Sequence, residues 1–202
     1  MKMKKYKIYG FMSLLAFAVA CSGGAETSTE EQVAENNSHA HHDHAAHSAA
    51  SNAKSPRTAA MANIGKNHVH IDYSAPSVRG REIYGGLVAW DEVWVTGAHT
   101  ATSISFDVPV SIEGKKIPAG KYALFTIPGQ SGWTVILNSN YEQHLADEYD
   151  ESEDIARFTL DNEMPENSVE QLRFEVVSLS DTKGEIRFAW AERGFRLAVE
   201  NS

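Results

Sequence analysis

Histidines are the residues of this chain with the clearest capacity for chemistry. The 202-residue sequence contains nine of them. Five lie close together beside Asp43, namely His39, His41, His42, His44 and His47. Neutral imidazole is a good ligand for zinc, copper and nickel, and a polar run lets several nitrogens converge on one ion. The run predicts metal affinity without specifying the metal, and the alternative is a polar spacer.

A second group of possible ligands lies where the sequence alternates between polar and apolar residues. His68, His70 and Asp72 alternate with apolar side chains, so we expect them on one face of a strand, roughly 6.5–7 Å apart from one to the next. Two imidazoles at that spacing can reach one ion, and a carboxylate can add to them. The alternative is that they form the water-facing side of an antiparallel strand.

Two further histidines could complete this site. His99 follows a Gly-Ala pair at an expected loop or strand end, and His144 precedes Asp147 by three residues within a segment, 141–149, that suits a short helix or an ordered loop. We therefore hypothesise a copper or zinc site in the folded domain. Its candidate ligands are His68, His70, His99 and His144, with Asp72 and Asp147 as carboxylates.

Tryptophans suggest a different kind of binding site. Trp90 and Trp94 stand close together, and exposed aromatic rings can stack on sugars or peptides. Large aromatic side chains more often belong to the core, which is the structural interpretation of both residues. The competing function is therefore an interaction module that binds a glycan, a peptide or a partner protein through its loops.

Motifs of catalysis are scarce. The sequence has no Gly-rich phosphate loop and no His-Glu pair of the zinc-protease type, and Gly129 to Gly132 is too short for a nucleophile elbow. A metal-dependent enzyme would need an open coordination position beside an acid or base. We expect binding rather than catalysis and assign no catalytic residue.

The single cysteine, Cys21, predicts where the protein resides. Lysines precede an apolar stretch from Ile8 to Ala20, which is shorter than the roughly 20 residues that span a bilayer. This layout predicts a signal peptide over residues 1–20, cleavage before Cys21 and a lipid anchor on its sulfur. It resembles the lipobox of bacterial lipoproteins, except that Ala18 stands where Leu is usual. We expect anchorage in the outer membrane facing the periplasm; the alternatives are an incidental thiol or an uncleaved anchor.

Charge and composition divide the remaining chain. Removing the leader takes four lysines away, so the net charge changes from −9 to −13. Such a charge argues against binding nucleic acid or anionic headgroups. Residues 21–62 contain few large apolar side chains and are expected to form a disordered tether, because they cannot bury enough surface to offset chain entropy. Residues 63–202 have the size of one domain.

Period-two alternation dominates this domain. Apolar residues occupy every second position in five segments, separated by turn signals such as Glu113-Gly114 and Pro128-Gly129. The segments are 68–73, 103–108, 133–138, 185–190 and 195–199. Many short strands separated by turns predict an all-β fold, an antiparallel β-sandwich or a jelly-roll-like single domain.

Three stretches of the chain resemble a known family. They are YSAPSVRGREIYGGLVAWDEVWVTGAHTA from Tyr73, KKIPAGKYALFTIPG from Lys115, and WTVILN from Trp133. Together they are similar to the domain of unknown function 2911, an uncharacterised bacterial family common in exported proteins of Bacteroidetes. The resemblance implies an all-β envelope domain and supplies no catalytic or ligand residues. Where that family motif has Arg-Thr-Gly-Ala-Asn-Glu, this chain has Val-Thr-Gly-Ala-His-Thr, which introduces His99.

Overall fold

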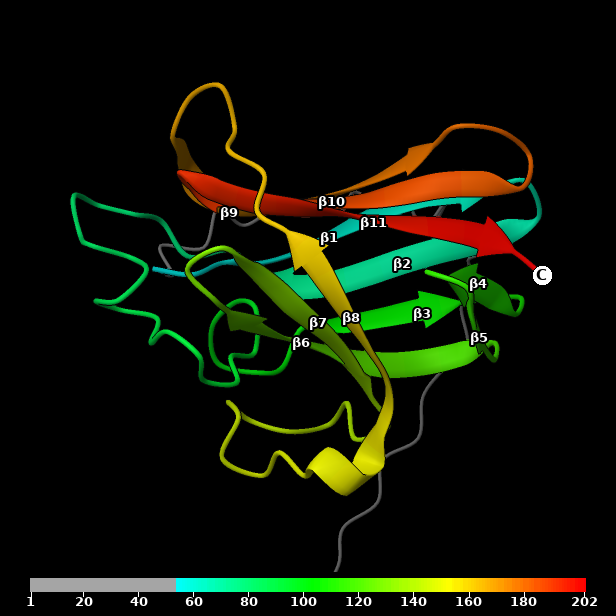
Figure 1. Cartoon of the computed structure of the whole chain (residues 1–202), viewed down its shortest axis with the longest axis horizontal. Coiled ribbons are helices and arrows are strands. Elements are labelled where there is room, and N and C mark those ends of the chain that lie inside the picture. Colours follow the sequence, from blue (N-terminus) through cyan, green and yellow to red (C-terminus); the bar gives the residue numbers. More distant parts are fainter. Residues whose placement is uncertain (1–53) are drawn as a thin grey trace, which may run out of the picture. The chain divides into compact units, whose positions relative to one another are not determined.

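The computed structural model describes residues 54–202, which fold into two antiparallel β-sheets (Figure 1). Eleven strands form the sheets, and all their pairings are antiparallel. The strands are β1 (Arg57–Ile64), β2 (Asn67–Ser74), β3 (Ser103–Phe106), β4 (Val110–Ile112), β5 (Lys115–Ile117), β6 (Gly120–Pro128), β7 (Gly132–Asn138), β8 (Asp154–Asp161), β9 (Val169–Ser178), β10 (Lys183–Ala191) and β11 (Arg193–Asn201). The predicted all-β sandwich fold is confirmed.

The order of the strands places long loops at the ends of the sandwich. One sheet has six strands in the order β1-β2-β3-β6-β7-β8, and the other has five in the order β5-β4-β11-β10-β9. In Figure 1, β9, β10 and β11 of the five-stranded sheet lie at the top, β4 and β5 of the same sheet lie at the right, and the loop that follows β2 extends to the left. The loop between β7 and β8 lies at the bottom of the same view.

Alternation along each strand decides which side chains enter the space between the sheets. In β2, Val69, Ile71 and Tyr73 are buried, whereas His68 and His70 on the opposite face are only partly buried. Successive side chains of a strand point to opposite faces, so one face of β2 packs into the core and the other meets solvent. The five predicted strands are thereby confirmed as parts of β2, β3, β7, β10 and β11.

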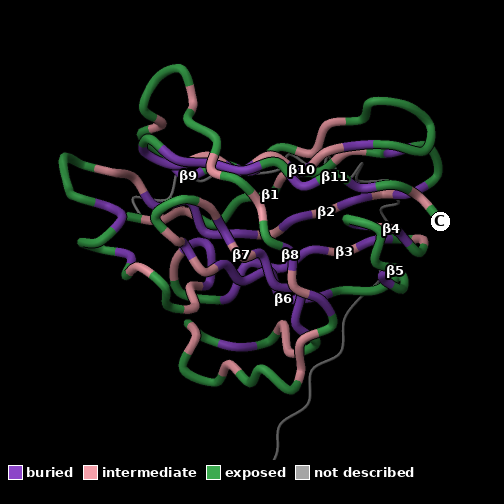
Figure 2. The backbone as a smooth tube through the Cα atoms, viewed as in Figure 1, coloured by how far each residue is buried: buried purple, intermediate pink, exposed green. Residues whose placement is uncertain are grey.

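Aromatic rings fill much of the core between the sheets. Trp133, Trp190 and Phe195 are almost completely buried, and Phe188 lies between the sheets with them. The Phe188 ring stacks on that of Phe195, with centroids 5.0 Å apart, and meets that of Trp133 edge-to-face, with centroids 5.4 Å apart. In Figure 2 the buried backbone runs along the facing strands, and the exposed backbone is concentrated in the loops. Burial of large aromatic surfaces is the main stabilising term in such a core.

The structure corrects one predicted boundary and decides between two alternatives for another segment. Strand β1 begins at Arg57, inside the segment 21–62 assigned to the tether, because β1 is Ala-rich and carries a weak strand signal. The segment 141–149 is a loop and not a short helix. In residues 54–202 the one helical turn is a 3₁₀ turn at Glu151–Glu153, and Leu145 has a positive φ of 55° that a helix does not allow.

Several predicted features lie outside the described residues. They are the signal peptide over residues 1–20, the lipidation site Cys21 and the tether histidines His39, His41, His42, His44 and His47. Among residues 54–202, no helix has the length and apolar character needed to cross a bilayer.

A buried guanidinium joins the loop after β2 to the rest of the sandwich. The Arg193 guanidinium carbon lies 5.0 Å from the centroid of the Trp90 ring, 5.5 Å from that of Trp133 and 5.6 Å from that of Tyr84. Its terminal nitrogens donate to the carbonyl oxygens of residues 129 and 130, at 2.7 and 3.1 Å, in the β6–β7 hairpin. A cation facing aromatic rings is attracted by their negative faces. Arg193 therefore connects three separate segments of the chain.

Arg193→Met should destabilise the protein by about 3 kcal/mol, because it removes both charge-assisted hydrogen bonds and the cation–π contacts. Denaturant unfolding of the full chain measures this change. Arg196→Met is the matched control, since Arg196 is half exposed and forms a surface ion pair with Glu163. The control should lose less than about 1 kcal/mol. Equal losses in the two variants would contradict the assigned role of Arg193.

Candidate metal centre

The outer face of the six-stranded sheet carries a pair of imidazoles. The rings of His68 and His70 on β2 have centroids 5.9 Å apart and are tilted by 52°. The His70 side chain is 28% exposed, so an ion can approach it from solvent. Metal–nitrogen distances of about 2.0–2.1 Å put two imidazoles that share an ion ~5–6.5 Å apart between centroids. The observed spacing fits two imidazoles that chelate one ion.

Each imidazole of this pair has one nitrogen held by an acceptor. His68 Nδ1 lies 2.9 Å from Asn63 Oδ1 on β1, and His70 Nε2 lies 3.1 Å from Asp72 Oδ1. Because both oxygens accept, these two nitrogens are the donors, and in the neutral imidazoles His68 Nε2 and His70 Nδ1 are the nitrogens that can bind a metal. Metal-binding histidines typically donate their second nitrogen to a carboxylate or carbonyl in this way. Asp72 therefore orients an imidazole, and Asn63 does the same.

A second pair of imidazoles comes from two loops. His99 and His144 have ring centroids 6.5 Å apart, and both residues are exposed. Leu145 N donates to His99 O at 2.8 Å, and a β-bridge joins Thr100 to His144, so the backbones of the two loops are paired. His99 and Leu145 both have positive φ, 64° and 55°, which is uncommon for residues other than glycine. The pair thus depends on a strained local backbone.

The four imidazoles form two pairs and not one centre. Within residues 54–202, no three His, Cys, Asp or Glu side chains are gathered closely enough to hold a metal together. Lys121 occupies the outer face beside the first pair, with its ammonium 3.9 Å from Asp72 Oδ2 and 5.3 Å from the centroid of the Tyr141 ring. A cation there disfavours a second cation nearby. Asp147 is exposed in the 141–149 loop.

A small second core supports the loop that carries His144. Phe125 and Ile136 point outward from β6 and β7 and are completely buried beneath the loops 93–101 and 141–149. The Tyr149 ring meets the Phe125 ring edge-to-face, with centroids 5.2 Å apart. These loops therefore cover one half of the outer face, while the half that carries His68 and His70 remains open.

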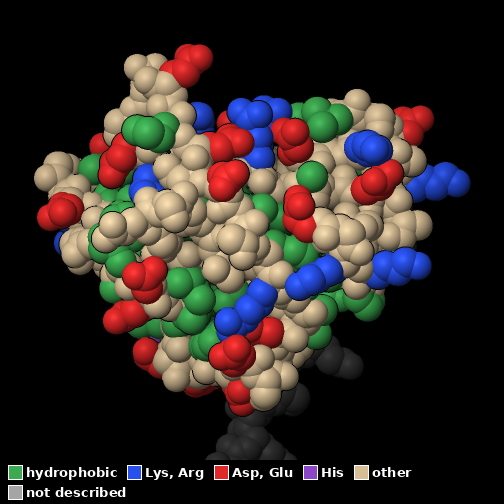
Figure 3. Space-filling view, viewed as in Figure 1, with side chains coloured by type: hydrophobic (Ala, Val, Ile, Leu, Met, Phe, Trp, Pro, Cys, Tyr) green, Lys and Arg blue, Asp and Glu red, His purple; other side chains and the backbone are tan. Residues whose placement is uncertain are grey.

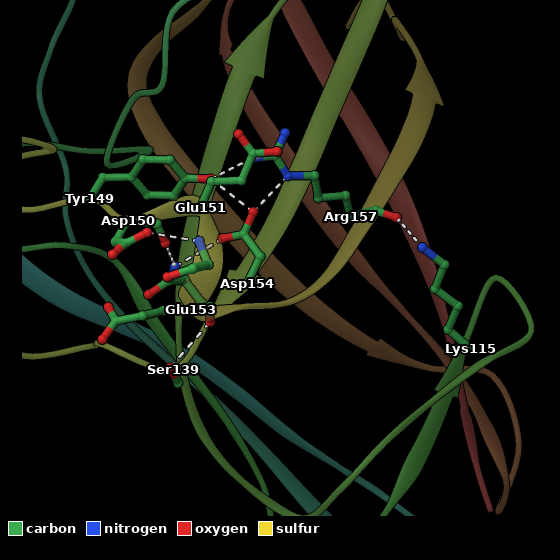
Figure 4. Close-up of polar contacts among 10 residues, drawn as sticks. Lys115, Ser139, Tyr149, Asp150, Glu151, Glu153, Asp154 and Arg157 are labelled. Atoms are coloured by element: carbon green, nitrogen blue, oxygen red, sulfur yellow. Dashed lines mark hydrogen bonds and ion pairs between the residues drawn. The ribbon is translucent and has the colours of Figure 1, made fainter.

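A polar cluster fixes the end of this loop (Figure 4). The carboxylate of Asp154 is 8% exposed and accepts from Tyr149 Oη at 2.8 Å and from Arg157 Nε at 2.6 Å. Asn138 Nδ2 donates to the other carboxylate oxygen at 2.9 Å. Beyond the cluster, Lys115 Nζ donates to the carbonyl of Arg157 at 2.8 Å. Asp154 thus anchors this loop, and no sequence pattern distinguishes it from the other acidic residues between positions 147 and 154.

Burial and the adjoining Asp154 raise the pKa of Tyr149 from 10.0 to about 12. The folded state therefore holds this proton more tightly than the unfolded chain, and the resulting stabilisation is lost as pH rises from about 10 to about 12. We expect Tyr149→Phe to reduce the decline in unfolding free energy over this range. Unfolding in denaturant at several alkaline pH values measures it. Burial also raises the pKa of Tyr84 and Tyr122, so part of the decline remains in the variant. If the unfolding free energy depends on pH in the same way in Tyr149→Phe and in the parent protein, Tyr149 does not have the raised pKa assigned to it.

Trp90 and Trp94 are packed against the core rather than displayed. The Trp94 ring stacks on that of Trp190, with centroids 5.7 Å apart and planes 22° apart, and its Nε1 donates to Gly97 O at 3.1 Å. Trp90 lies between Tyr84 and Arg193. Gly85, with φ of +88°, passes so close to the Trp90 indole that an added Cβ would lie 2.6 Å from its Nε1. This packing supports the structural interpretation of both tryptophans.

Comparison with known proteins identifies the family of this chain. The family model described as "Protein of unknown function (DUF2911)" matches residues 55–199, nearly the whole of the described domain. The chain belongs to this family. The DUF2911 match starts at residue 55, two residues before β1, and ends within β11. No curated protein and no solved structure matches the chain.

Proposed function

We propose that this DUF2911 protein binds a transition-metal ion, copper or zinc, through the His68–His70 pair, and that it buffers the ion without catalysing a reaction. The proposal rests mainly on the orientation of the two rings. Asn63 and Asp72 hold one nitrogen of each imidazole, so the remaining nitrogens are left with lone pairs on an open face of the sheet.

Two imidazoles leave most of the coordination sphere of the ion to water or to other donors. Structural zinc sites have four protein ligands and catalytic zinc sites have three. A site with two protein ligands exchanges its ion readily, which suits capture and release better than permanent retention. The ligand type also favours copper or zinc over calcium or magnesium, which prefer oxygen donors.

Two other features support metal binding in this chain. The His99–His144 spacing of 6.5 Å is close to that of two imidazoles on one ion, although neither ring has a fixed partner of the kind seen at His68 and His70. The five clustered histidines between residues 39 and 47 provide further imidazoles in the same chain. The alternative, a glycan- or peptide-binding module centred on Trp90 and Trp94, is less well supported because both rings pack against neighbouring side chains.

Metal titration of the full chain tests the pair directly. The background carries alanine at all five tether histidines, which removes their contribution, and zinc and copper are each titrated by calorimetry. We expect His68→Ala with His70→Ala to reduce affinity to that of single surface imidazoles, because chelation is lost. Asp72→Ala should weaken binding about tenfold, because the His70 ring loses its orienting partner.

The control for this experiment is His99→Ala with His144→Ala in the same background, which removes two exposed imidazoles elsewhere. This control should retain the tighter binding. If the His68/His70 variant binds each metal as tightly as its parent, the proposed function is wrong.

We further propose that the protein is exported and held at the cell envelope by a lipid on Cys21, as the basic and apolar residues before this cysteine indicate. Cys21→Ala should move the protein from the membrane fraction to the soluble fraction of cells that express the full chain. Immunoblots of the two fractions measure the shift, and Ser22→Ala serves as the control. Retention of Cys21→Ala in the membrane fraction would contradict lipid anchorage at this residue.

A further inference from the structure

A recess of about 370 Å³ lies on the outer face of the six-stranded sheet, where the 141–149 loop meets β1, β3 and β6. Its lining includes Arg57, Ser103, Lys121, Tyr141 and His144. The size falls within the range of small-molecule sites, about 300–1,000 Å³. The lining does not include His68 or His70, so a ligand in the recess would bind separately from a metal ion on that pair.

Basic groups gather around this recess although the chain as a whole has a net charge of −9. No carboxylate in residues 54–202 forms an ion pair with Arg57. The Lys121 ammonium pairs with Asp72 only at 3.9 Å, and both side chains are about two-fifths exposed. Glu142 is the one acidic residue in the lining. The lining therefore contains two basic side chains and one acidic side chain.

Hydroxyl groups supply further donors beside these cations. Ser103 is 3% exposed and lies on β3 between Asp72 of β2 and Ala123 of β6. Thr100 and Tyr141 lie in the lining with it. Hydroxyls and ammonium or guanidinium groups together suit the oxygens of a carboxylate or a phosphate, because hydrogen bonds between ionised partners are the stronger kind.

Backbone hydrogen bonds hold the walls of the recess in place. Ala101 N donates to Gln143 O at 3.0 Å, and Leu145 N donates to His99 O at 2.8 Å. Gln143 is 2% exposed, and its Nε2 donates to Asn140 O at 2.6 Å. A wall that is fixed before a ligand arrives costs less entropy on binding.

We propose that this recess binds a small oxyanion, a molecule whose carboxylate or phosphate group lies between Arg57 and Lys121. The ligand is a small molecule rather than a polyanion, because the recess has a volume of about 370 Å³ and only two basic side chains in its lining. Positive and negative side chains are interspersed over the face of the molecule shown in Figure 3. The site would extend the protein's function from metal binding to the binding of a small acid.

The test uses the full chain in detergent and in buffers passed over a chelating resin, so that no metal can bridge the anion to histidine. Succinate and inorganic phosphate are titrated separately, and amide chemical shifts of Thr100, Ser103 and Lys121 report binding. Lys121→Met should weaken binding of the preferred anion about tenfold, since one charge-assisted contact is lost. Lys116→Met, at an exposed position of β5, is the matched control and should leave the affinity unchanged.

The arms of this experiment distinguish the sources of the oxyanion. A response to succinate alone identifies a carboxylic acid, and a response to phosphate alone identifies a phosphorylated molecule. Binding of either anion that is weakened in Lys121→Met and intact in Lys116→Met supports the site. Absence of binding at tens of millimolar of both anions, or equal affinity in the two lysine variants, overturns it. Neither outcome depends on the metal titration.

Discussion

A positive charge buried among aromatic rings is the contact on which much of the architecture depends. Arg193 lies at the start of β11, yet it contacts Tyr84 and Trp90 in the long loop after β2 and the carbonyls of the β6–β7 hairpin. Burial lowers the pKa of Arg193, but an arginine keeps its proton at any physiological pH. The interaction therefore holds over the whole pH range in which the protein functions. Arg193 acts together with backbone hydrogen bonds, such as those between Trp94 and Thr126, to hold the loop between β2 and β3 against the sheets.

The outer face of the six-stranded sheet is divided by what the loops cover. Phe125 and Ile136 are buried beneath the two loops that carry His99 and His144, and the Asp154 cluster holds one of these loops in place. The other half of the face, around His68 and His70, is left open. The proposed metal pair lies on the open half of this face, and the proposed oxyanion recess lies at the border, where the 141–149 loop meets the strands.

Local periodicity was enough to predict five of the eleven strands and the His68–His70 spacing, since both follow from the two-residue repeat of a strand. Contacts between distant segments were not predictable. Asn63 was missed as a partner of His68 because β1 was assigned to the tether, and its register with β2 was unknown. The sequence left open whether the 141–149 segment was a short helix or an ordered loop, because its conformation depends on pairing with the loop around His99. The role of Arg193 required the tertiary fold, because its aromatic neighbours lie about 60 to 110 residues away in sequence.

Strand β8 is an edge strand of the six-stranded sheet, and Lys115 donates its ammonium to the carbonyl of Arg157 in the middle of that strand. Exposed backbone at a sheet edge invites pairing with another chain, which begins aggregation. A neighbouring molecule that approached β8 would have to displace a charged side chain and leave it without its acceptor. The contact between Lys115 and the Arg157 carbonyl thus occupies an acceptor on this edge that would otherwise be open to a strand of another chain.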